Sequence, residues 1–77
     1  MGARQVVYEV REKDTLLHPP FLFQGAALDF VRAHVKAAGK ASSAYFIANE
    51  ADPDQIQLRL YSDSNFMITI DEVNADG

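Results

Sequence analysis

The sequence predicts a small α+β domain, a two-layer sandwich in which one helix packs on a mainly antiparallel sheet of about four strands in the order β-α-β-β-β. The prediction depends on periodicity. Segments in which apolar residues recur at every second position flank a single segment in which they recur every three or four positions. The 77 residues contain no cysteine, so residues 1–77 are expected to form one domain held by a small hydrophobic core.

The first predicted strand is Val6–Arg11, which is rich in β-branched and aromatic residues. Its alternation places Val6, Tyr8 and Val10 on one face. We expect the strand to end at Asp14 and Thr15, whose short polar side chains are typical of turns.

The next segment, Leu16–Gln24, is apolar but contains Pro19 and Pro20, which exclude a helix. Three readings stay open. Phe21–Phe23 forms a further short strand at the sheet edge, the segment folds over the core as a lid, or it is a partner-binding loop. A small-molecule site beneath the segment is a separate possibility. His18 lies in this segment, and the sequence does not place it near any other candidate residue.

The one predicted helix is Gly25–Ala38. Its apolar residues share a broad arc that faces the sheet, while Asp29 and the basic residues occupy the other side. Gly39 is expected to end the helix in a left-handed conformation. His34 falls within the apolar arc, and we expect it to be buried with one hydrogen-bond partner.

The second predicted strand, Ala44–Ala48, is apolar on both faces. This pattern indicates a central strand, or a strand whose outer face contacts a partner. A turn at Ala51–Asp54 follows, with proline at its second position.

The clearest element is the hairpin Gln55–Asp71, with strands at Gln55–Tyr61 and Phe66–Asp71 and a polar turn at Ser62–Asn65. We expect its last strand either to be an open sheet edge that could pair with another strand, or to be covered by the first strand or by the apolar residues 21–23. Residues 74–77 are expected to form a frayed tail. The core-facing residues of the hairpin are Ile56, Leu58, Leu60, Phe66, Ile68 and Ile70.

Charge is distributed unevenly around the net value of −4. Residues 1–41 carry six basic and four acidic side chains, whereas residues 42–77 carry one basic and seven acidic side chains. The predicted acidic surface consists of Glu50, Asp52, Asp54 and Asp63. The basic residues of the helix, which would contact phosphates if the domain bound nucleic acid, are Arg32, Lys36 and Lys40.

No catalytic or metal-binding pattern accompanies these elements. Glu50, Asp52 and Asp54 alternate as in a calcium loop, but the glycine and the distal glutamate of such loops are missing. Asp71 and Glu72 would point to opposite faces of a strand and cannot act as a paired acid and base. We therefore expect no enzyme activity, no metal and no cofactor.

The sheet face opposite the helix is the main functional candidate. The sequence predicts a non-enzymatic protein-binding module that acts as an accessory protein or as an inhibitor, as small acidic phage-encoded inhibitors do, and that can form a homodimer. The alternative is a nucleic-acid-binding domain that uses the basic helix face. No signal peptide or membrane span is expected, which favours a cytoplasmic location. The expected protein-binding residues are Arg59, Tyr61, Met67, Thr69, Tyr45 and Ile47.

Overall fold

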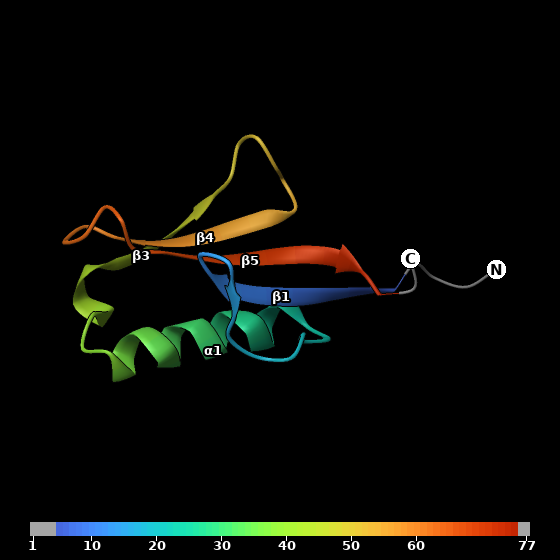
Figure 1. The fold of residues 1–77 in the computed structure, drawn as a ribbon, viewed down its shortest axis with the longest axis horizontal. Helices are drawn as coiled ribbons and strands as arrows, with labels where there is room; N and C mark the ends of the chain where they lie inside the picture. Colours follow the sequence, from blue (N-terminus) through green and yellow to red (C-terminus); the bar gives the residue numbers. More distant parts are fainter. Residues whose placement is uncertain (1–4, 76–77) are drawn as a thin grey trace.

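The computed structural model describes residues 5–75 and shows a five-stranded antiparallel sheet with one helix on one face (Figure 1). The predicted α+β class is confirmed. The strands follow the spatial order β2-β1-β5-β4-β3. In chain order the elements are β1 (Val6–Glu12), β2 (Thr15–Leu16), α1 (Gln24–Ala37), the 3-10 turn η1 (Ala41–Ser43), β3 (Ala44–Ala48), β4 (Gln55–Leu60) and β5 (Met67–Asn74).

The predicted hairpin is formed by β4 and β5, and it lies at the centre of the sheet. Because β1 pairs along the whole length of β5, β5 is an interior strand, and the alternative of an open edge at this strand is wrong. The strand also runs further than expected. Asn74 pairs with Val6, and the Ala75 N–H donates to the Gln5 carbonyl, so residues 74 and 75 continue along β1. Residues 76 and 77 of the expected tail lie outside the described residues.

The core forms where the apolar stripe of α1 meets the matching face of the sheet. Residues spaced by four positions on the helix lie over residues spaced by two on the strands, as the two periodicities require. Each fully buried aliphatic side chain contributes about 1.5–3 kcal/mol to folding. The eight buried residues are Val10, Ala27, Val31, Val35, Leu58, Leu60, Ile68 and Ile70.

The helix begins and ends one residue earlier than predicted, and Gly39 ends it in the left-handed conformation that was expected. Its N-cap is Phe23, which makes no side-chain capping bond. At the other end Gly39 adopts a φ of +75°. The Gly39 N–H donates to the Lys36 carbonyl and the Lys40 N–H donates to the Val35 carbonyl, which together form a Schellman motif. The motif turns the chain towards η1 and β3.

The proline segment borders the β1 edge of the sheet. The β1–β2 turn contains Lys13 with a φ of +56°, and β2 is only two residues long. Tyr8 and Phe21 then exchange two backbone hydrogen bonds of 2.8 and 2.9 Å as an isolated bridge. The predicted strand at Phe21–Phe23 is therefore reduced to one bridging residue.

β3 occupies the opposite edge of the sheet and pairs with β4 alone. The interpretation of Ala44–Ala48 as a central strand is wrong. Its apolar character on both faces has another cause, because Phe46 packs against the core while Tyr45 and Ile47 lie on the face that α1 does not cover. The boundaries of the strand are those predicted.

Candidate functional site

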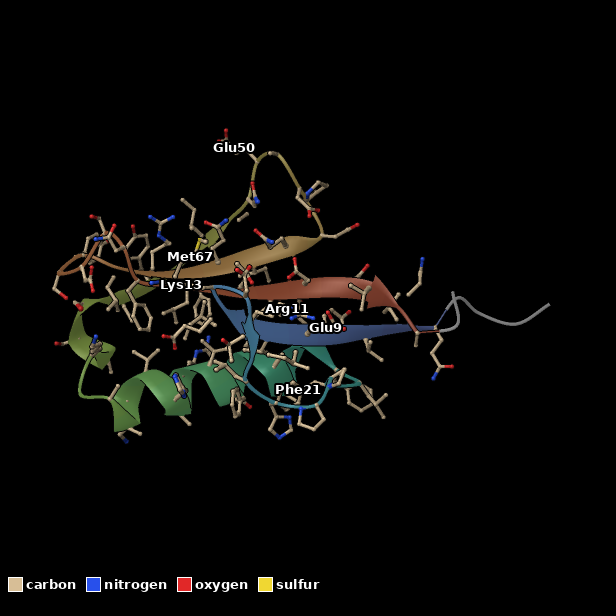
Figure 2. All side chains as sticks on the ribbon, in the orientation of Figure 1. Glu9, Arg11, Lys13, Phe21, Glu50 and Met67 are labelled. Carbon is tan, nitrogen blue, oxygen red and sulfur yellow. The ribbon has the colours of Figure 1, made fainter. Side chains whose placement is uncertain are left out.

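The sheet face opposite α1, here called the open face, has no helix over it in Figure 1. Strand register brings five of the six expected binding residues to this face, and the sixth stacks on one of them. Tyr45 lies opposite Arg59, which lies opposite Met67, and the next row contains Ile47 and Thr69 with Gln57 between them. Figure 2 shows Met67 on the side of the sheet away from the helix. The sixth residue, Tyr61, follows β4 directly.

Four large side chains on the open face form what we call the aromatic patch: Tyr45, Ile47, Tyr61 and Met67. The rings of Tyr45 and Tyr61 stack with their centroids 4.3 Å apart. Tyr61 is 79% exposed and Ile47 is 49% exposed, so much apolar surface at this end of the sheet faces water. Large exposed aromatic and aliphatic groups that adjoin each other are typical of protein interfaces.

Arg59 is held in place beside the aromatic patch. One guanidinium nitrogen donates to the Ser64 carbonyl at 3.1 Å and the other lies 3.7 Å from the Met67 sulfur. These contacts fix the side chain before any partner arrives, so less conformational entropy would be lost on binding. The arginine supplies a positive charge next to an apolar surface.

A hydrogen-bonded row of polar side chains crosses the open face at the start of β4 and was not predicted. The Gln55 side-chain amide donates to Asp71 at 2.7 Å, while its carbonyl oxygen accepts from Asn49 at 2.8 Å and from Gln57 at 3.0 Å. The alternating polar residues of β4 were the available signal, because cross-strand neighbours of this kind pair with each other. The row lies beyond the row of Ile47, Gln57 and Thr69, at the end of the open face next to the β3–β4 loop.

The four acidic residues do not form one surface. Glu50, Asp52 and Asp54 belong to the β3–β4 loop, whereas Asp63 lies in the β4–β5 turn at the other end of β4. Figure 2 shows Glu50 at the tip of its loop, projecting away from the sheet. The Asp52 carboxylate accepts the Asp54 N–H, which shapes the turn. The β3–β4 loop is thus a local acidic loop at the end of the edge strand.

The basic residues of the helix face border a groove between α1 and β3. The groove has a volume of about 370 Å³, and its lining includes Arg32, Lys36, Phe46 and Leu58. It does not include any residue of the Leu16–Phe23 segment, where a small-molecule site was one possibility. Arg32 lies 3.5 Å from Asp29 and 5.4 Å from the centroid of the Phe46 ring.

Lys40 also packs on an aromatic ring, with its Nζ 4.9 Å from the centroid of Phe66. A cation at this distance from a ring is attracted by the negative face of the ring. Two of the three predicted basic residues therefore contact the domain's own side chains. Lys36 completes the basic group at the end of the helix.

Neither histidine lies in a closed polar site. His34 is half-exposed instead of buried, and its Nε2 lies 3.5 Å from Glu12 Oε1. His18 stacks on Phe21 at 4.4 Å and extends the aromatic contacts of the helix to the proline segment. These contacts give both rings a packing role at the edge of the core.

Among residues 5–75, the side-chain contact that shifts a pKa is made by Tyr8. Its hydroxyl donates to Glu72 Oε1 at 3.1 Å. Partial burial raises the pKa of Tyr8 above its ordinary value, and the hydrogen bond and negative charge of Glu72 raise it further. The pair joins β1 to β5, so we assign it a structural role.

No helix within residues 5–75 is both long and apolar enough to cross a membrane. Comparison of the chain with protein-family models, with curated proteins and with solved structures finds no match in any of the three. The functional argument therefore depends on the surfaces described above.

Proposed function

We propose that this protein is a non-enzymatic protein-binding module that acts as an accessory protein or inhibitor in the cytoplasm, with the aromatic patch as its contact surface. The single observation that supports the proposal is the uncovered sheet face, on which the stacked Tyr45 and Tyr61 adjoin Ile47 and Met67. Burying such side chains against a partner removes apolar surface from water, which favours association. Arg59 adds a pre-positioned donor at the margin of the patch.

The acidic β3–β4 loop defines the charge of the surface beside the patch. A partner with basic groups near an apolar depression would complement both features. An inhibitor of this kind would cover a basic, nucleic-acid-binding surface on its target. Its association should weaken as salt rises, since exposed charges are screened beyond about 8–10 Å at physiological ionic strength.

We do not propose the nucleic-acid alternative. Arg32 is paired with Asp29 and packed on Phe46, and Lys40 is packed on Phe66. These contacts account for two of the three basic residues without any phosphate.

The test compares capture by the immobilised wild-type chain with capture by the double variant Tyr61→Glu, Met67→Glu. A matched control is the double variant Leu22→Glu, Phe23→Glu, which places the same two negative charges at exposed apolar residues just before α1, 63% and 73% exposed. The proposal predicts one or more captured proteins that the Tyr61→Glu, Met67→Glu variant loses and the control retains. Capture that is equal for all three chains would exclude the aromatic patch as the contact surface.

A further inference from the structure

The exposed edge of β3 is built differently from the other edge of the sheet. Edge strands in soluble proteins are usually protected by short length, charge, proline or a covering segment. At the opposite edge, β2 is only two residues long, and the Phe21 bridge covers part of β1. β3 instead presents five consecutive uncharged residues, Ala44–Ala48, and contains no proline.

The direction of the backbone groups in β3 follows from the flanking hydrogen bonds. The Tyr61 N–H donates to the Ser43 carbonyl, and the Asn49 N–H donates to the Gln55 carbonyl. In an antiparallel pair the bonded residues alternate, so Tyr45 and Ile47 direct their N–H and C=O groups to β4. The N–H and C=O groups of Phe46, together with the N–H of Ala48, therefore point away from the sheet.

We infer that a second copy of this chain pairs with this edge, β3 against β3 in antiparallel orientation, to form a continuous ten-stranded sheet across a two-fold axis at Phe46. In this register each Phe46 exchanges two hydrogen bonds with its symmetry mate, and each Ala48 N–H donates to the Ala44 carbonyl of the other copy. The Ala44 N–H is not needed, because it already donates to the Ala41 carbonyl. The register thus uses nearly every outward backbone group.

The sequence of β3 fits a partner identical to itself. Residue size is symmetric about Phe46, with Tyr45 and Ile47 on either side and alanines at both ends. Two-fold pairing places Tyr45 of each copy opposite Ile47 of the other on the open face, an aromatic and β-branched pair of the kind that stabilises sheets. The 49% exposed Ile47 becomes covered.

Charge provides the second argument for a second copy. The residues that precede β3 are basic, with Lys36 and Lys40 at the end of the helix, whereas the loop that follows β3 carries Glu50, Asp52 and Asp54. Antiparallel pairing brings the segment before β3 of one copy beside the segment after β3 of the other. Each acidic loop therefore meets a basic helix end, twice in the dimer. A parallel arrangement would place like charges together.

The groove between α1 and β3 lies along the same edge. Phe46 lines this groove and lies on the two-fold axis of the inferred dimer. The Phe46 ring of the second copy therefore lies at the mouth of the groove. The inference does not rest on the proposed function, because it is argued from the backbone and charges of the β3 edge. The two surfaces share Tyr45 and Ile47, whereas Tyr61 and Met67 lie outside β3.

The first test is analytical ultracentrifugation of the wild type and of Ala48→Pro over a range of concentrations. Proline at this position removes an outward N–H and is compatible with an edge strand, so the fold should survive while the pairing is lost. Ala48→Thr is the matched control, because it retains the N–H and favours a strand. The dimer dissociation constant should rise at least about tenfold for Ala48→Pro and change little for Ala48→Thr.

The second test uses charge and does not alter the strand. Two double variants are compared. One carries Lys36→Glu and Lys40→Glu, and the other carries Glu50→Lys and Asp54→Lys. Asp52 is left unchanged because its carboxylate shapes the turn. Each variant alone should dimerise at least about tenfold more weakly than the wild type, and an equal mixture of the two should form a heterodimer. The inference is overturned if the wild type keeps the mass of one chain, 8.5 kDa, up to about 1 mM, or if the mixture dimerises no better than its components.

Discussion

The neighbouring residues Ile68 and Met67 give the sharpest test of the two faces of the sheet. Ile68 is fully buried against the helix, whereas Met67 is partly exposed on the open face. Truncating each to alanine removes a similar volume of side chain from adjacent positions of the same strand. Any difference in stability then reports which face is packed.

The magnitude for Ile68→Ala follows from its burial. At about 0.8 kcal/mol for each buried methyl or methylene group, the lost transfer free energy is about 2.4 kcal/mol. The cavity left beneath α1 raises the loss to about 3–4 kcal/mol. Met67→Ala should cost less, about 1 kcal/mol, because that side chain is only partly buried and its loss leaves no enclosed cavity beneath α1.

The assay is equilibrium urea unfolding at one fixed protein concentration, with the slope of the transition compared between variants. A chain of 77 residues is expected to have a free energy of unfolding of about 4–12 kcal/mol. The stability lost in Ile68→Ala therefore approaches the lower limit of this range. Ile68→Val, expected to cost about 0.5–1.5 kcal/mol, provides a milder variant. Equal losses for Ile68→Ala and Met67→Ala would refute the assignment of one packed and one open face.

The remaining predictions concern the backbone and one ionisable pair. Gly39→Ala should destabilise the domain by about 1 kcal/mol in thermal unfolding, because Gly39 has a φ of +75° although the added Cβ would meet no atom within 4 Å. Gly25→Ala lies within the helix, where an added Cβ also meets no atom within 4 Å, and it should stabilise the domain by about 0.4–1 kcal/mol. If both glycine substitutions changed the stability in the same direction, the helix end described at Gly39 would be contradicted. Since the pKa of Tyr8 is raised from 10.0, its contribution to stability is complete below pH 10 and is lost as pH rises through the folded value. The free energy of unfolding should therefore fall less steeply above pH 10 for Tyr8→Phe than for the wild type. Identical slopes would mean that folding does not raise the pKa of Tyr8.

Much of the fold follows from the sequence because its two periodicities are distinct. The alternation in β4 and β5 fixes which residues face the core, and the boundaries of β3 match the predicted range. The grouping of Tyr45, Arg59 and Met67 on one face could also be predicted, because alternation alone determines the face once the core side is known.

The position of each strand in the sheet could not be predicted in the same way. Alternation identifies faces but not neighbours, so it is compatible with β5 either at an edge or in the interior of the sheet. Apolar residues on both faces of β3 are equally compatible with a central strand and with an edge strand that contacts a partner. The interior position of β5 depends on its long pairing with β1, a contact between the two ends of the chain. The polar row around Gln55 likewise depends on three separate segments meeting in register.

Amide hydrogen exchange along β3 tests most directly the claim that this edge is a binding surface. Tyr45 and Ile47 direct their N–H groups to β4, so their exchange should be slow and nearly independent of protein concentration. The Phe46 and Ala48 amides should exchange rapidly in dilute solution and become protected as concentration rises and the second copy pairs with the edge. Rapid exchange of Phe46 and Ala48 at every concentration would contradict the account.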